Sequence, residues 1–242
     1  MNGMKSVSVN IVMTYPVHWT KYQVLRDFVQ NFYDSVGHID WRQRFCYEYN
    51  NSVIYMWIKN VSFNYEWLMH IGASTKTGHS KEYAGFFGEG FKIASLCGLR
   101  DYGWEIQMMS GDWHIDVTEI EQFIDQTPVK MLAYNISSVN KVEETRLVLK
   151  NISLSDYSLF KTVLDSFFGA DNPIMGKQLW MGREGAVFLR SKIPINRNLP
   201  VTENFGRKGA VFCGYQMLGT NPFDLVVCLH NYKKDDRERR SI

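Results

Sequence analysis

Three polar residues of one predicted helix carry side chains that could bind a metal ion beside a phosphate. Asp27, Asn31 and Asp34 lie at positions i, i+4 and i+7, so they share one helical face. Magnesium prefers hard oxygen ligands, of which the protein usually supplies few and phosphates and water the rest. The amide oxygen of Asn31 could be such a ligand, and a carboxylate one turn away could polarise a water for attack on phosphorus. A plain solvated helix face is the alternative, which the spacing alone favours.

A second candidate is the glycine-rich segment that runs from Gly85 to Lys92. Its glycines, Gly85, Gly88 and Gly90, directly precede an apolar helical pattern that begins at Phe91. Glycine lets a backbone approach a ligand closely, and a helix directs its first N–H groups and its positive dipole end towards an anion. Lys92 could add a direct charge. An ordinary turn before a helix is the alternative reading of such a segment.

The two segments together resemble motifs of the GHKL ATPases, the family of the Bergerat ATP-binding fold. Residues 27–34 resemble its N-box, with Asp27 in place of the usual Glu, and residues 85–92 match its lid motif G-x-x-G-x-G-F-K at every fixed position. Ile71–Lys76 resembles the segment that opens the lid. The resemblance implies Asn31 as magnesium ligand, Asp27 as the water-activating acid, and contacts to ATP from a set of further residues: Asp34, Lys76, Gly85, Gly88, Gly90, Phe91 and Lys92.

The segments that would contact the adenine base depart from the motifs of the family. The family has D-x-G-x-G after its second strand, whereas Asn60, Ser62 and Asn64 occupy the three fixed positions here. The side-chain oxygen of Asn60 can still accept a hydrogen bond from an adenine amino group. The segment Glu144–Leu149 resembles the strand motif G-T-x-I-x-L, which implies that Thr145 contacts the adenine site. A plain turn at Asn60 and an ordinary strand threonine at Thr145 are the alternatives.

The elements that must position these residues predict an α+β fold. Apolar spacing predicts a helix that begins near Thr20 and ends at Gly37, a buried helix over Phe91–Leu99 and a third over Leu154–Phe168. Strands are predicted at several alternating runs: Val7–Met13, Phe45–Tyr49, Val53–Ile58, Trp104–Met109, Trp113–Val117, Met131–Ile136, Arg146–Leu149, Ala186–Leu189, Ala210–Phe212 and Leu225–Leu229. This order predicts a two-layer α/β sandwich, with helices on one face of a mixed, mostly antiparallel sheet, and a β extension at the C-terminus.

Composition limits the classes of function and the domain organisation. The 242 residues are 45% hydrophobic and 21% charged, which suits a packed domain. We expect an ATP-binding domain over residues 1–168, and over 169–242 a β-rich extension or the start of a following domain. The net charge of +2 does not support nucleic-acid binding by this chain. The four cysteines are scattered along the sequence, which suits reduced thiols in the cytoplasm. The sequence contains no run of about 18 apolar residues, so we expect no membrane-spanning helix.

These patterns predict magnesium-dependent ATP binding with slow hydrolysis, in which ATP acts as a conformational switch. The alternative is a degenerate domain that keeps the fold as a scaffold or binds nucleotide without hydrolysing it, as the altered adenine motif suggests. Self-association or contact with another domain of a larger protein is expected by analogy with the family. The sequence shows no helical hairpin with a phosphoacceptor histidine, which argues against a histidine kinase.

Overall fold

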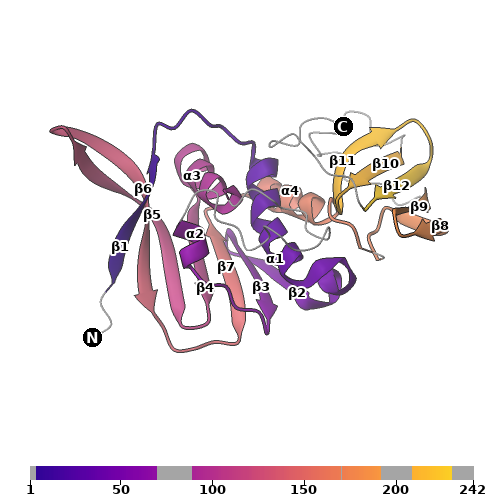
Figure 1. Ribbon diagram of the computed structural model, residues 1–242, viewed down its shortest axis with the longest axis horizontal. Coiled ribbons are helices and arrows are strands. Elements are labelled where there is room, and N and C mark those ends of the chain that lie inside the picture. The colour runs from indigo at the N-terminus through magenta and orange to yellow at the C-terminus, as the bar shows by residue number, and fades with distance from the viewer. Residues whose placement is uncertain (1–3, 70–88, 170, 192–208, 231–242) are drawn as a thin grey trace.

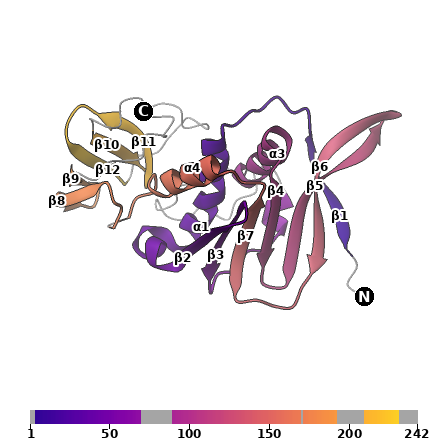
Figure 2. The ribbon, with the colours of Figure 1, turned by 180° about the vertical axis from the view of Figure 1, so that it is seen from behind.

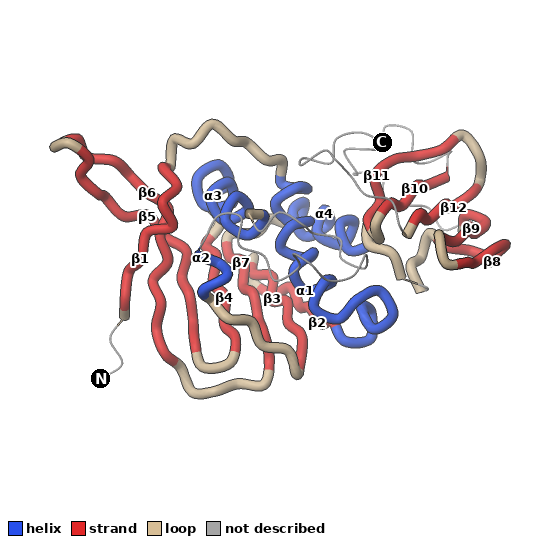
Figure 3. Tube along the Cα trace, viewed as in Figure 1, coloured by secondary structure: helices blue, strands red, loops and turns tan. Residues whose placement is uncertain are grey.

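A computed structural model describes residues 4–69, 89–169, 171–191 and 209–230 (Figure 1; Figure 3). Its helices are α1 (Lys21–Arg44), α2 (Glu66–Met69), α3 (Gly90–Tyr102) and α4 (Leu154–Leu164). Its strands are β1 (Lys5–Val12), β2 (Phe45–Asn50), β3 (Val53–Lys59), β4 (Glu105–Ser110), β5 (Trp113–Ile124), β6 (Thr127–Ser138), β7 (Glu144–Lys150), β8 (Met175–Gly182), β9 (Gly185–Arg190), β10 (Gly209–Cys213), β11 (Gln216–Asn221) and β12 (Leu225–Leu229). The fold is therefore α+β, as the sequence predicts.

Helix α1 begins at a capping box and bends at a glycine. The hydroxyl of Thr20 accepts a hydrogen bond from the backbone N–H of Gln23, whose side chain accepts one from Thr20 N in return. Gly37 has φ 74° and ψ 172°, so the helix is interrupted there and then resumes up to Arg44. The prediction that Gly37 ends the helix is wrong in this respect. The second helical stretch is held because it buries Trp41, whose ring stacks on Phe45 at 4.3 Å.

The larger sheet has seven strands in the order β1-β6-β5-β4-β7-β3-β2, and every neighbouring pair is antiparallel. The expectation of mixed pairing is therefore wrong for this sheet. Strands β5 and β6 are longer than predicted and pair over their full length up to a two-residue turn at Asp125 and Gln126. Their far end projects beyond the rest of the molecule (Figure 1), and Phe123 is 69% exposed there.

One face of this sheet carries the core. Alternate side chains of β3, β4 and β7 are fully or almost fully buried: Ile54, Met56, Ile58, Ile106, Met108, Leu147 and Leu149. Helices α1, α2 and α3 lie on the face that is turned to the viewer in Figure 1, and Figure 2 shows the sheet from behind. The opposite face carries polar side chains such as Gln107, Arg146 and Lys150. This is the pattern of an antiparallel sheet with one packed and one solvated face.

The smaller sheet has five strands in the order β11-β10-β12-β9-β8. Its β10–β12 pair is parallel and its other pairs are antiparallel, so the mixed pairing occurs here. Strands β8 and β11 are not predicted from sequence. The buried residues Phe167 and Phe168, which follow α4, join the two sheets, and Phe168 N donates a hydrogen bond to Tyr215 O at 2.8 Å.

Candidate functional site

The candidate metal-binding face of α1 is largely buried in the fold. Asp27 and Asp34 are 8% and 7% exposed, while Asn31 is partly exposed. The side-chain Nδ2 of Asn31 donates a hydrogen bond to Asp27 O at 3.0 Å. This bond leaves Oδ1 of Asn31 as the atom that could bind a metal ion, and the Asn31 side chain makes no second hydrogen bond within the described ranges. The alternative of a solvated helix face is therefore wrong for Asp27 and Asp34.

Asp27 lies at the contact between α1 and the first residue of α3. A Cβ atom added to Gly90 would lie 2.3 Å from Oδ1 of Asp27 and 3.3 Å from its Cγ. Cβ atoms in proteins essentially never lie within 3.0 Å of a non-bonded heavy atom, so position 90 accepts only glycine while Asp27 keeps its place. The two motifs singled out in the sequence therefore meet in space at this point.

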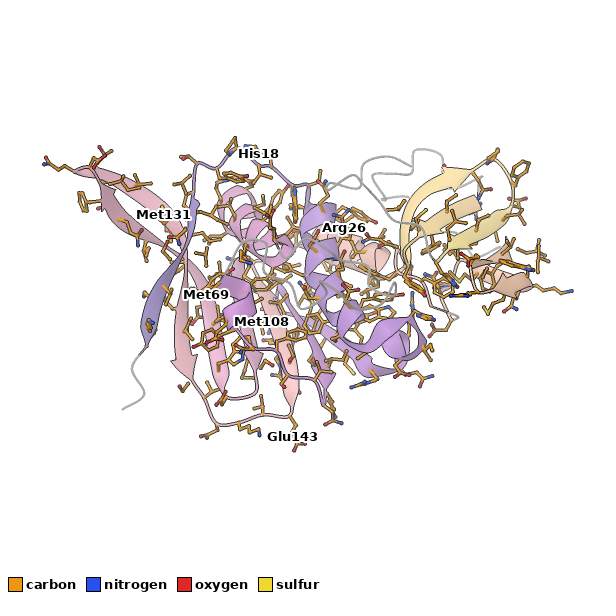
Figure 4. All side chains as sticks on the ribbon, viewed as in Figure 1. His18, Arg26, Met69, Met108, Met131 and Glu143 are labelled. Atoms are coloured by element: carbon orange, nitrogen blue, oxygen red, sulfur yellow. The ribbon has the colours of Figure 1, made fainter. Side chains whose placement is uncertain are left out.

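A neighbouring arginine neutralises the carboxylate of Asp27. Nη2 of Arg26 lies 3.0 Å from Oδ2 of Asp27, and both side chains are about nine-tenths buried (Figure 4 labels Arg26). A buried ion pair of this kind is costly to break because the remaining charge would be left without a partner. Arg26 was not identified from sequence, where it is one of several charged residues of the helix.

Helix α3 presents its N-terminal end at the same place. The first intrahelical bond runs from Ile93 N to Glu89 O, so the N–H groups of Gly90, Phe91 and Lys92 precede it. The side chain of Glu89 does not cap the helix. An anion placed before Gly90 would meet these N–H groups and the positive end of the helix dipole.

Two predicted ligand residues at this helix start are buried. Phe91 is 6% exposed, and its ring contacts those of Phe28 and Tyr134 at 5.6 and 6.1 Å between centroids. Lys92 is 1% exposed, and burial lowers the pKa of its ammonium group to about 8. Phe91 therefore serves the contact between α1, α3 and the sheet. Lys76, Gly85 and Gly88, the remaining predicted lid residues, lie outside the described residues.

Asp34 lies two turns further along α1 than Asp27, a rise of about 10 Å along the helix axis. Its charge helps to raise the pKa of the neighbouring Tyr33, for which burial is the larger cause. The hydroxyl of Tyr33 donates a hydrogen bond to Phe168 O at 2.8 Å, where the two sheets are joined. Asp34 is thus close to the junction with the smaller sheet.

Thr145, predicted to contact the base, is fully buried beneath the segment that follows β3. Its hydroxyl donates to Val61 O at 2.8 Å and shares a second hydrogen bond of 2.7 Å with Ser110 Oγ. Ser110 Oγ in turn accepts from Phe63 N at 2.8 Å, and Trp113 Nε1 donates to Phe63 O at 2.8 Å. These bonds fix the segment to β4, β5 and β7. Ser110 and Trp113 were not identified from sequence as functional residues; they flank the two-residue turn between β4 and β5.

Asn60 is exposed at the end of β3. Its φ of 56° is left-handed, and its N–H donates to Glu143 O at 2.7 Å. Together with Ser62, Asn64 and residues of the β4–β5 and β6–β7 connections it lines a cavity of about 710 Å³. Neither Thr145 nor Asp27 lines this cavity. Figure 4 shows Glu143, which also lines it, well separated from Arg26 on α1.

No cluster of three or more His, Cys, Asp or Glu side chains that could hold a metal ion occurs in the parts of the chain that the structure describes. None of the described helices is both long enough and apolar enough to cross a bilayer. A scan of protein-family models and a search of curated proteins each found no match to this sequence.

Proposed function

We propose that the chain is an ATP-binding domain of the GHKL type, in which magnesium-ATP binds between α1 and the N-terminal end of α3. The observation that carries the proposal is the contact of Asp27 with Gly90, because it joins the candidate metal-binding helix to the candidate phosphate-binding helix start. The antiparallel sheet with helices on one face agrees with the two-layer architecture that the Bergerat fold requires.

The residues present suit magnesium and a triphosphate. Oδ1 of Asn31 would be the single protein ligand, which agrees with the habit of magnesium of taking most ligands from phosphates and water. The N–H groups that precede the first bond of α3 would receive phosphate oxygens, and Lys92 would regain the stabilisation that burial removes from its charge. When bound, magnesium would neutralise charge on the phosphates.

The second candidate is a non-hydrolysing domain, and two observations favour it over an active ATPase. Oδ2 of Asp27 lies 3.0 Å from Nη2 of Arg26 in a buried ion pair, so this oxygen is already engaged and does not face an attacking water. The hydroxyl of Thr145 is bonded to Val61 and Ser110 and has no exposed surface from which to contact a base. The engaged carboxylate of Asp27 predicts slow or absent turnover, and the buried hydroxyl of Thr145 predicts that the base is bound without this contact.

Calorimetric titration with ATP in the presence and absence of magnesium tests the proposal. We expect micromolar binding that requires magnesium and is lost in Asn31→Ala. Asn140→Ala, an exposed asparagine of the β6–β7 connection that lies outside the segments predicted to contact ATP, is the matched control and should bind as the wild type does. No binding by the folded wild-type protein would reject the nucleotide assignment, and equal binding by Asn31→Ala would reject the metal-binding role.

Phosphate release separates the two candidates. The isosteric variant Asp27→Asn keeps the volume at the Gly90 contact while it removes the carboxylate charge. Turnover by the wild type that falls in Asp27→Asn would support an ATPase. Equal, background-level release by both proteins, with ATP binding intact, would support the non-hydrolysing domain.

A further inference from the structure

The larger sheet has one face that is turned away from the helices. Helix α4 lies on the packed side with the other three described helices, because the ring of its Phe160 contacts that of Tyr47, whose cross-strand partner Met56 is fully buried. Figure 2 views the other side, which we call the open face. None of the undescribed stretches directly precedes or follows β3, β4, β5 or β7, the strands at its centre.

Cross-strand pairing places two neighbouring rows of side chains across the middle of the open face. The first, which we call the carboxylate row, runs from β2 to β5 through Glu48, Tyr55, Val148, Gln107 and Asp116. The second, the arginine row, runs over the same strands through Cys46, Trp57, Arg146, Met109 and His114. Glu48 is exposed and the other members of both rows are partly exposed, so a second molecule can reach them.

The centre of the open face carries side chains that are typical of protein interfaces. The guanidinium group of Arg146 lies 5.9 Å from the centre of the Trp57 ring, with Met109 on the next strand. Trp, Tyr, Met and Arg are enriched in interfaces, whereas Lys and Glu are depleted at their centres. The lysines of this face lie in the flanking rows, paired with glutamates: Lys59 with Glu144 and Lys150 with Glu105.

The polar side chains of the open face make their contacts within the sheet. Nε2 of Gln107 donates to Oδ1 of Asp116 at 2.7 Å, and Nδ1 of His114 lies 3.5 Å from Oδ2 of Asp116. Nη2 of Arg146 lies 2.6 Å from Oε1 of Glu144. In the described chain these five side chains make no hydrogen bond or ion pair with a residue outside the sheet. The face is therefore available to a partner.

We propose that the open face packs against the same face of a second copy of this chain, about a two-fold axis that crosses the strands between the carboxylate row and the arginine row. Such an axis lays each strand over its own counterpart and exchanges the two rows. Val148 then faces the partner's Arg146, and Asp116 faces the partner's His114. The packing is that of two aligned sheets about 10 Å apart.

The charges of the open face select a second copy as the occupant, because under this axis the face is complementary to itself. Glu144 lies beyond the arginine row and Lys150 beyond the carboxylate row, so the exchange also places Glu144 opposite the partner's Lys150. An axis parallel to the strands through β7 would instead bring Arg146 onto the partner's Arg146, and Glu48 onto the partner's Asp116. Like charges in such contacts are unfavourable, so the axis across the strands is preferred.

The open face is large enough for a homodimer of moderate strength. The strands from β2 to β6, about 4.8 Å apart, and four rows of side chains, about 7 Å apart, cover on the order of 25 by 25 Å. Contact over this area buries about 600 Å² per copy, or about 1,200 Å² in all, which is the lower end of the range for stable interfaces. We therefore expect a dissociation constant in the micromolar range.

Sedimentation equilibrium of the whole chain without ATP tests the proposal, since the open face and the proposed nucleotide site lie on opposite sides of the sheet. We expect a monomer–dimer equilibrium. Val148→Arg places a cation against the partner's Arg146 twice in each dimer and should weaken the dimer by at least about 100-fold. Val148→Glu, matched in position, places a carboxylate there instead and should dimerise within about 5-fold of the wild type or more tightly.

A control separates the effect of the contact from that of the added charge. Leu154→Arg adds the same charge at the start of α4, where the side chain is 73% exposed, and should dimerise like the wild type. Positions 148 and 154 are both accessible in the single chain, so the variants should fold, and circular dichroism checks that they do.

Four results would overturn the proposal. A wild-type protein that stays monomeric up to about 100 μM would show that the open face does not bind a second copy. A dimer that persists in folded Val148→Arg, or that dissociates equally in Leu154→Arg, would place the interface elsewhere. Equal weakening by Val148→Arg and Val148→Glu would contradict the exchange of the two rows. An assembly that grows beyond two copies would contradict an interface that is closed by two-fold symmetry.

Discussion

Replacing Gly90 with alanine would place a methyl group where Asp27 already lies. The added Cβ would be 2.3 Å from Oδ1 and 3.3 Å from Cγ of that residue, so either the start of α3 or the carboxylate must move. Asp27 is not free to rotate, because Arg26 holds its other oxygen at 3.0 Å within the protein. Gly90 has no left-handed φ, so lack of space and not backbone strain is the cause of the expected effect.

We expect Gly90→Ala to lower the free energy of unfolding by about 1–3 kcal/mol, the usual cost of overpacking a filled site. If the shift breaks the pair of Asp27 with Arg26, the loss would approach the roughly 3–5 kcal/mol of a buried charge that loses its partner. Gly98→Ala in the same helix is the control, since the one close contact of its Cβ would be the terminal Cδ1 of Ile106 at 2.9 Å, while Trp104 Cε3 and Val24 Cγ1 lie at ordinary van der Waals distances of 3.5 and 3.7 Å. That flexible methyl can move, so the control should be almost neutral.

Urea denaturation followed by tryptophan fluorescence, to which the buried Trp41 and Trp104 contribute, measures these changes. In an Asp27→Ala background the obstructing oxygen is gone, and the same Gly90→Ala change should cost about 1–3 kcal/mol less than in the wild type. Equal costs in the two backgrounds would show that residues 27 and 90 do not touch. The geometry that carries the proposed nucleotide site would then be wrong.

Three further predictions concern buried polar groups. Thr145→Val should destabilise the fold by about 1–3 kcal/mol in urea denaturation, because it removes the hydrogen bonds of the Thr145 hydroxyl to Val61 O and to the hydroxyl of Ser110. Thr118→Val, at a partly exposed position of β5, is the control and should be close to neutral. Burial, together with the charge of the nearby His38, lowers the pKa of His230. As the pH falls, the unfolded chain therefore takes up a proton at this residue before the folded chain does, and the thermal midpoint should fall below about pH 6.5. The fall should be smaller in His230→Gln. Burial lowers the pKa of Lys92 from 10.5 to about 8, so between these pH values the unfolded chain binds more protons than the folded chain. The free energy of unfolding of the wild type, compared with that of Lys92→Met, should therefore rise by up to about 3 kcal/mol as pH increases from 8 to 10.5. A pH-independent difference between wild type and Lys92→Met would show that this ammonium group is not desolvated.

Much of the fold could be predicted from local patterns. The helix starts are encoded by neighbouring residues, as the capping box of Thr20 and Gln23 shows, and the β2–β3 hairpin by its turn between Asn50 and Val53. Strand β8 was not predicted because its residues do not alternate between buried and exposed positions. The helical stretch beyond Gly37 was not predicted because a glycine with positive φ normally ends a helix, and the continuation is held by tertiary contacts such as the burial of Trp41 and the 2.8 Å ion pair of Arg42 with Asp165.

The sequence by itself determined which residues could bind magnesium and phosphate, since the side-chain oxygens of one α1 face and the glycines before α3 are local properties of the chain. Only the tertiary structure decided that Asp27 meets Gly90, that Arg26 neutralises this carboxylate, and that Thr145 is bonded beneath Val61. These contacts join segments that are distant in sequence, or depend on how deeply α1 is buried against the sheet. Residue spacing along one helix sets the direction of a side chain, whereas its partner and its exposure to water are set by the elements that pack against it.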